Sequence, residues 1–181
     1  KGDANPRETL IYSILNFSND KTEKTIYVPQ EHQAFIQQLL TNAKFNITVL
    51  PYDENQEEPE NSVLHYETLP GRQFAEITME QSGQDFDSVL QKQTNYLRQN
   101  GIMTINLLLP TSSSLNPEIN SHLLKNGYFF SGFKPTPDSN WKIVYCNLLS
   151  QIFDFNKIQL FSEESKQLSE YIQTEYKKIT E

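Results

Sequence analysis

The residues of this sequence that could carry chemistry are three histidines, one cysteine and a short serine run. His32, His65 and His122 are far apart, share no metal-ligand spacing and have no cysteine or Asp–Glu cluster beside them, so we expect no metal. The run "TSSS" (111–114) offers hydroxyl nucleophiles without a His/Asp arrangement, and a loop is the better interpretation. Cys146 lies in a β-rich run, where we expect a small buried hydrophobe and a reactive thiol is the alternative.

The composition indicates a folded, acidic chain. Its 181 residues are 36% hydrophobic and 12% aromatic, which is enough to build a core. The formal net charge of -8 repels phosphate, so we expect neither nucleic acid nor a membrane as partner. No apolar run approaches the ~20 residues needed to span a bilayer. Because Lys1 stands where an initiator methionine would be, we expect a piece of a longer protein, with the cytoplasm as the default location.

Hydrophobic periodicity predicts seven strands and four helices after residue 23, in the order β, α, β, β, β, α, β, α, β, β, α. The strands are expected at 24–29, 46–52, 62–70, 72–80, 102–110, 128–133 and 141–149, and the helices at 30–43, 85–101, 115–127 and about 162–179.

The run 102–110 is almost continuously apolar, as expected for a strand covered on both faces, so we place it centrally and parallel to the strand at 72–80. These elements predict one mixed, twisted sheet with helices on its faces. A further β-rich run, 10–17, could belong to a preceding domain, so residues 1–23 are set apart from a single α/β domain at 24–181.

The segment "LLKNGYFFSGFKP" (123–135) takes a helix directly into a strand. Asn116 is expected to cap the short helix, and Ile119 and Leu123 are expected to share its sheet-facing side. Gly127 ends the helix, because a left-handed residue costs glycine no Cβ clash, and three aromatic residues then begin a strand.

This order of elements and this segment resemble the GNAT (Gcn5-related N-acetyltransferase) fold, over about residues 24 to 160. The tail "FDFNKIQLFS" (153–162) and the stretch "KTIYVPQEHQAFIQQLL" (24–40) are similar to a GNAT-like domain of bacterial multidomain proteins. The resemblance implies about seven mostly antiparallel strands with a central parallel pair and flanking helices. It also implies acetyl-CoA as cofactor and acyl transfer to an amine as reaction.

The resemblance places the acyl-CoA site in "EQSGQDF", which begins at Glu80, where the family has Arg/Gln-x-x-Gly-x-Gly/Ala. Backbone N–H groups of Gln81, Ser82 and Gly83 would hold the pyrophosphate. The sequence departs from the family pattern, since it has one glycine and puts two carboxylates, Glu80 and Asp85, where phosphates would lie. We expect Asp85 to be the N-cap of the following helix, so that its carboxylate accepts from the free N–H groups of the first helical turn.

The resemblance also suggests catalytic positions. A glutamate on the fourth strand is the family's frequent general base, and Glu76 or Glu80 could supply it; alternatively, both are the polar face of a half-exposed strand. The family's frequent general acid is a tyrosine near the end of the short helix. Leu123 stands there and cannot protonate a thiolate, and Tyr128 is shifted from that position and expected in the core.

Two functions are therefore expected. In the first, a degenerate GNAT-like domain serves as a non-catalytic sensor or interaction module, with other domains of a larger protein or a separate protein as partner. In the second, the domain transfers an acyl group from acetyl-CoA to an amine. The departures at the acyl-CoA loop favour the module, while the fold favours the enzyme, because most members of the superfamily are enzymes.

Overall fold

The computed structural model describes residues 23–53, 57–69, 71–136 and 140–180. Within these ranges the expected order of strands and helices is confirmed, and the strand predicted at 10–17 lies outside them. The strands are β1 (Lys24–Val28), β2 (Ile47–Pro51), β3 (Val63–Thr68), β4 (Phe74–Gln81), β5 (Thr104–Pro110), β6 (Phe129–Pro135) and β7 (Trp141–Asn147). The helices are α1 (Gln30–Asn42), α2 (Phe86–Gln99), α3 (Ile119–Lys125) and α4 (Glu163–Thr180), with a short 3-10 turn, η1 (Phe155–Lys157), before α4.

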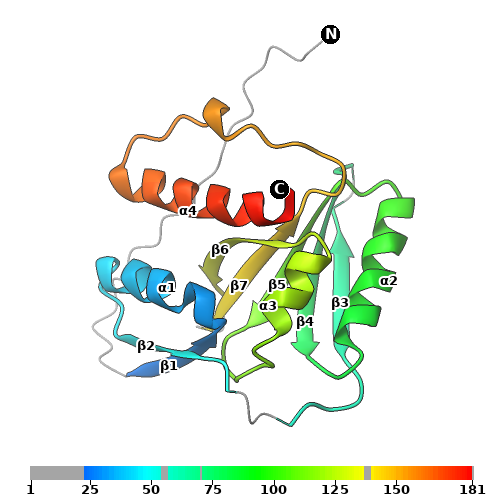
Figure 1. Ribbon diagram of the computed structural model, residues 1–181, viewed down its shortest axis with the longest axis horizontal. Helices are drawn as coiled ribbons and strands as arrows, with labels where there is room; N and C mark the ends of the chain where they lie inside the picture. Colours follow the sequence, from blue (N-terminus) through cyan, green and yellow to red (C-terminus); the bar gives the residue numbers. More distant parts are fainter. Residues whose placement is uncertain (1–22, 54–56, 70, 137–139, 181) are drawn as a thin grey trace.

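The main sheet has five strands in the order β3-β4-β5-β7-β6 (Figure 1). β5 is its central strand and runs parallel to β4, while the β3–β4, β5–β7 and β6–β7 pairs are antiparallel. The fold is therefore mixed α/β, and the predicted central place of the run 102–110 and its parallel pairing with the preceding strand are confirmed.

The prediction of one continuous sheet is wrong, because β1 and β2 form a separate parallel pair joined through α1. Two α1 side chains close the free edge of β2 in place of another strand. Gln33 Nε2 donates to Val49 O (2.9 Å), and Gln37 both donates to Ile47 O (3.2 Å) and accepts from Val49 N (3.1 Å). With these backbone groups occupied, β2 has no open edge to offer β3.

One face of the main sheet is apolar and covered by helices. Ala75 and Ile77 of β4 lie opposite Ile105 and Leu107 of β5, and all four are fully buried. Figure 1 shows α3 in front of β4 and β5 and α2 beside β3. The alternate residues of β4, Glu76 among them, point to the opposite face and are at least partly exposed. That face is the more solvated one.

The expectation that the run 102–110 is covered on both faces holds only for its second half. Leu107, Leu108 and Leu109 are consecutive and all buried, so both faces are shielded there. Thr104 and Asn106 are partly exposed, because their side chains point to the solvated face of the sheet.

The turn from α3 into β6 follows the sequence closely. Gly127 has a φ of +76°, as predicted for a glycine that ends a helix, and Leu123 is fully buried. The predicted cap is wrong by two residues, because α3 begins at Ile119 and Glu118 stands at its N-cap position. Asn116 Oδ1 instead accepts from Glu118 N (2.8 Å) and stabilises the turn that precedes the helix.

A buried hydrogen-bond chain centred on His32 joins four elements. The Tyr145 hydroxyl of β7 donates to Asn120 Oδ1 of α3 (2.8 Å) and lies 3.0 Å from His32 Nε2, and the Tyr171 hydroxyl of α4 lies 2.8 Å from His32 Nδ1. Because the Tyr145 hydroxyl donates to Asn120, a neutral His32 donates to Tyr145 through Nε2–H and leaves Nδ1 as an acceptor for the Tyr171 hydroxyl, which also has Glu31 O as an acceptor at 3.2 Å. The ring is fully buried 4.4 Å from that of Phe130, and this burial lowers its pKa to about 4.

This lowered pKa predicts a loss of stability in acid. The pKa of His32 is about 4 in the folded protein and near 6.5 in the unfolded chain, so the unfolded chain takes up the proton first as the pH falls. The free energy of unfolding therefore decreases as the pH drops through this window. From about pH 7.5 to about pH 4.5, His32 should lower it by roughly 2–3 kcal/mol. Urea denaturation of the native chain and of His32→Gln at both pH values measures it as a difference. Parallel pH profiles of the two proteins contradict the prediction.

Leu123→Ala should lower the free energy of unfolding by about 2–5 kcal/mol, because it empties a fully buried leucine site. Chemical denaturation measures the change. Ser121→Ala, at an exposed position of the same helix, is the control and should stay within about 0.5 kcal/mol of the native chain. Equal midpoints for Leu123→Ala and the control would place Leu123 outside the core.

Candidate functional site

The loop between β4 and α2 packs its backbone against the segment Pro59–Ser62. Gly83 N donates to Ser62 Oγ (2.9 Å), and Gln84 N donates to Pro59 O (2.9 Å). Phe86 N donates within the loop, to Gly83 O (3.0 Å). Of the three N–H groups predicted to hold a pyrophosphate, that of Gly83 therefore already has a partner inside the protein, and so does that of the following residue, Gln84.

The other two residues predicted to bind cofactor also face this segment or the interior. Gln81 is the last residue of β4, and its side-chain Nε2 donates to Asn61 O (2.8 Å). Ser82 is buried at 7% exposure. The structure thus brings Gln81, Ser82 and Gly83 together against Asn61 and its neighbours.

The backbone contact explains why residue 83 is glycine. A Cβ at Gly83 would lie 2.5 Å from the carbonyl carbon of Asn61 and 2.8 Å from Pro59 O, closer than real Cβ contacts. The glycine permits close approach of another stretch of the same chain, which is a sufficient reason for it without any ligand.

Asp85 occupies the predicted N-cap position of α2, but its side chain does not cap the helix. Asp85 Oδ1 instead accepts from Ser62 N (2.6 Å). The expectation that it would occupy the free N–H groups of the helix is wrong, because the approaching segment presents an N–H group to the carboxylate. Its negative charge stays beside the loop.

The two candidate bases lie on the solvated face of β4, each beside a cation or potential cation. Glu76 Oε2 is 3.1 Å from Lys134 Nζ, with side chains 35% and 40% exposed, so the pair reaches from β4 to β6 across that face. Glu80 Oε2 is 3.2 Å from His65 Nε2, with both side chains more than half exposed. Glu80 follows Glu76 by four positions, or about 13 Å along β4, so the two glutamates act as separate sites.

β4 and β5 part at their carboxyl ends. Their paired residues stop at Thr78 and Leu108, whereas β4 continues to Gln81 and β5 to Pro110. The residues beyond this point pair with β3 and β7. The separation lies at the end of the sheet that also carries Glu80 and the loop 82–85.

The remaining candidates are structural. The Tyr128 hydroxyl is 2.7 Å from Thr94 Oγ1 and buried, and burial raises its pKa well above the ordinary value, so its predicted place in the core is confirmed. Burial also raises the pKa of Cys146 to about 12, which fits a small buried hydrophobe. Among the described residues, no three His, Cys, Asp or Glu side chains gather closely enough to hold a metal ion.

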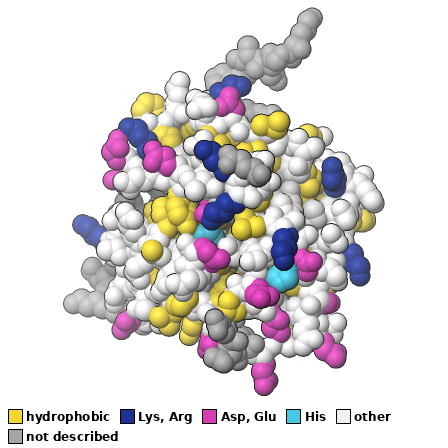
Figure 2. All heavy atoms as spheres, viewed as in Figure 1, with side chains coloured by type: hydrophobic (Ala, Val, Ile, Leu, Met, Phe, Trp, Pro, Cys, Tyr) yellow, Lys and Arg dark blue, Asp and Glu magenta, His cyan; other side chains and the backbone are white. Residues whose placement is uncertain are grey.

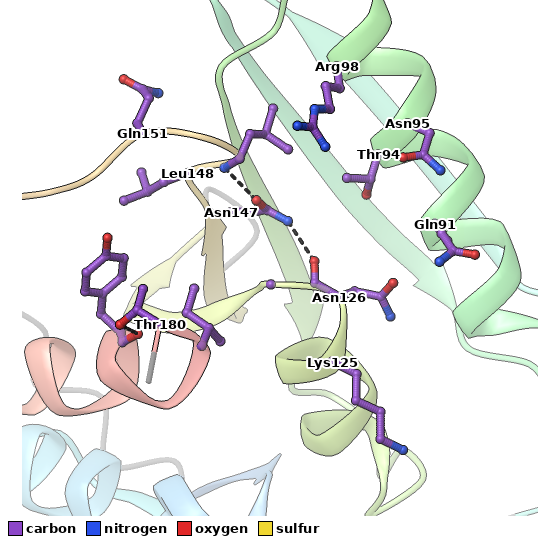
Figure 3. Close-up of a pocket in the computed structure, with 14 residues that line it drawn as sticks. Gln91, Thr94, Asn95, Arg98, Lys125, Asn126, Asn147, Leu148, Gln151 and Thr180 are labelled. Atoms are coloured by element: carbon purple, nitrogen blue, oxygen red, sulfur yellow. Dashed lines mark hydrogen bonds between the residues drawn. The ribbon is translucent and has the colours of Figure 1, made fainter.

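The sequence did not point to a cavity of about 340 Å³, which lies at the other end of the sheet. It lies between α2, the α3–β6 turn, the end of β7 and the end of α4 (Figure 3). Asn147 at its centre is committed to the fold, since Nδ2 donates to Asn126 O (2.9 Å) and Oδ1 accepts from Leu149 N (2.7 Å). Its two cations, Arg98 and Lys125, lie in last helical turns, where positive charge offsets the helix dipole. The lining residues come from α2, the α3–β6 turn, the end of β7 and α4, which are far apart in the sequence, so no local sequence signal marks the cavity.

No protein-family model matches the sequence, and no curated protein sequence matches it. In the parts of the chain described above, no helix is both long enough and apolar enough to cross a bilayer.

Gly83→Ala should lower the free energy of unfolding by about 1–3 kcal/mol, because the added methyl group collides with the Asn61 backbone. Urea denaturation tests this expectation. Gln84→Ala, at the exposed neighbouring position, removes a side chain without adding a clash and serves as the control. An unchanged midpoint for Gly83→Ala means that the loop does not hold the segment Pro59–Ser62 this closely.

Proposed function

We propose that this chain is a GNAT-like domain that has lost strong acyl-CoA binding and serves as a sensor or interaction module of a larger protein. One observation carries the proposal. The segment Pro59–Ser62 accepts a hydrogen bond from Gly83 N, one of the three N–H groups that the family resemblance assigns to the pyrophosphate, and another from the adjacent Gln84 N.

The energetics of displacement support this proposal. A diphosphate would have to break the hydrogen bonds from Gly83 and Gln84 and move a segment that touches the backbone at Gly83, with about 1 kcal/mol at stake in each bond. It would also approach the carboxylates of Asp85 and Glu80, and like charges in a partly dry site repel strongly. Both effects weaken acyl-CoA binding in the same direction.

Exposed apolar side chains support a role in protein contacts. Ile152 and Phe161, in the connection between β7 and α4, are 93% and 94% exposed, and Phe153 is 36% exposed. A neighbouring domain or partner protein would bury this apolar surface favourably. Figure 2 shows basic side chains scattered among acidic ones on the face in view, an arrangement that does not favour a phosphate backbone as partner.

The alternative is an active acyl-CoA-dependent N-acyltransferase, and one observation favours it. β4 and β5 separate beyond Thr78 and Leu108, which offers an opening between parallel strands at the end where the loop lies. In this alternative Glu76 or Glu80 is the base that accepts a proton from the amine.

Isothermal titration with acetyl-CoA distinguishes the two functions. We expect a Kd no tighter than about 1 mM, or roughly -4 kcal/mol, because the loop N–H groups are occupied and two carboxylates lie beside them. A Kd in the low micromolar range contradicts the module. It would make Glu76→Gln and Glu80→Gln the next variants, to be assayed for acyl transfer to a panel of amines.

Two variants test whether the loop has been placed correctly. Ser62→Ala removes the hydroxyl that accepts from Gly83 N, and Asp85→Asn removes one negative charge from the expected phosphate position. Tighter acetyl-CoA binding by either variant places the degenerate site at this loop. Thr174→Ala, at an exposed position of α4, which packs at the β6 end of the sheet, should bind as the native chain does.

A further inference from the structure

The outer edges of three described strands are covered by other parts of the chain. α4 packs against β6, and the outer edge of β2 is closed by the side chains of Gln33 and Gln37. β1 faces the end of β5, where Tyr27 N donates to Thr111 O (2.9 Å). Backbone or side chains of the same protein therefore meet each of these edges.

The outer edge of β3 is the exception among the described strands. It receives one side-chain hydrogen bond, from Gln93 Nε2 to Leu64 O (3.0 Å). No other described segment is paired with it, since β3 ends the five-stranded sheet. β3 is therefore the edge at which strand backbone is open to another molecule.

The open backbone groups of β3 can be identified. Leu69 N donates to Phe74 O across the turn to β4. Because hydrogen-bonded residues alternate along an antiparallel ladder, the N–H and C=O groups of Tyr66 and Thr68 point away from β4. A strand laid alongside would find donors and acceptors at a two-residue spacing.

Large side chains are exposed along the same edge. Val63, Tyr66 and Leu69 are 36%, 40% and 46% exposed. Tyr96 of α2 is 51% exposed, and its ring centroid lies 5.9 Å from that of Tyr66. An apolar rim therefore accompanies the open backbone. Of the features that usually turn an edge away from pairing, β3 has a register shift at its start, between Val63 and Leu64, and one carboxylate, Glu67.

We propose that a second copy of this chain pairs with β3 in antiparallel fashion, about a two-fold axis at Tyr66, so that two five-stranded sheets become one continuous sheet. In this register Tyr66 lies opposite Tyr66 of the other copy. His65 lies opposite Glu67 of the other copy, and Val63 lies opposite its Leu69. The relation is reciprocal, as a two-fold interface requires.

The sequence of β3 is self-complementary in this register, which is why the occupant is a second copy. Each exposed apolar residue meets an apolar residue, and each carboxylate meets a histidine. Within one copy Glu67 lies directly opposite Glu76 of β4, which already pairs with Lys134, and among the described residues no cation pairs with Glu67. The other copy's His65, which lies 3.2 Å from Glu80 of its own chain, would place a potential cation beside Glu67 as well. The pairing of β3 with itself therefore accounts for both ends of the strand.

The two exposed tyrosines fit the same arrangement. Tyr66 lies on the face of the sheet that carries α2, since it is opposite the buried Ile77. The two-fold axis would gather Tyr66 and Tyr96 of both copies into one aromatic cluster between the two α2 helices. This inference is independent of the acyl-CoA proposal, because no group invoked for cofactor binding lies on the outer edge of β3.

Sedimentation velocity of the 181-residue chain, from about 1 µM to about 1 mM, tests the dimer over the affinities expected for a small interface. We expect a monomer–dimer equilibrium, and a monomer at every concentration overturns the proposal. Tyr66→Lys, which puts two lysines face to face at the axis, should raise the Kd about tenfold or more. The matched control is Leu50→Lys on the closed edge of β2, at a position 39% exposed, and it should leave the Kd unchanged. Equal effects of the two substitutions also overturn the proposal.

A charge exchange tests the register and separates it from any loss of folding. His65→Glu places glutamate opposite Glu67, and Glu67→Lys places lysine opposite His65, so each variant alone should dimerise about tenfold or more weakly. In a mixture, the introduced glutamate of one variant faces the introduced lysine of the other, and the unchanged Glu67 faces the unchanged His65, so a mixed dimer should form. Circular dichroism first verifies that both variants are folded. A mixture no more associated than its components rules out this pairing and leaves another partner protein as the occupant of the edge.

Discussion

The structure depends on the hydrogen-bond chain through His32, because it fixes the β1-α1-β2 unit and the last helix to the main sheet. α4 has one fully buried residue, Glu175, and no fully buried apolar side chain, so packing alone holds it weakly. Tyr171 attaches it twice, through its hydroxyl to His32 and through its ring, stacked 3.7 Å from that of Phe35. A neutral histidine suits this place, because it can donate to Tyr145 and accept from Tyr171 at once.

α4 and two other segments determine which parts of the sheet another molecule can contact. α4 covers β6, α1 closes β2 with two glutamines, and the segment Pro59–Ser62 closes the N-terminus of α2. The two glutamines of α1 and the segment Pro59–Ser62 thus satisfy open backbone groups by hydrogen bonding, whereas α4 covers β6 by packing. The outer edge of β3 and the solvated face of β4 remain as the surfaces at which another molecule can meet the sheet.

The sequence predicted what depends on local patterns. Alternation placed Ile77 and Glu76 on opposite faces, and Gly127 ended α3, because the periods of strands and helices and the conformational freedom of glycine act within a few residues. The sequence did not predict the split into two sheets. That split depends on the hydrogen bond from the Gln33 side chain of α1 to Val49 O of β2, a contact that no local pattern shows. Nor did the sequence predict the contacts of Asp85, because the N–H group of Ser62 comes from 23 residues away in the chain.

Gly83 shows why a loop motif is ambiguous until the fold is known. A glycine after a strand lets something approach the backbone closely, and the approaching group can be a phosphate or another stretch of chain. Here the Asn61 backbone occupies that space, and the hydroxyl of Ser62 accepts from the N–H group that a phosphate would use. The same residue that makes the loop resemble a cofactor site therefore allows the protein to close it. Under the proposed function, the glycine of the family pattern outlasts the ligand because it keeps this structural role.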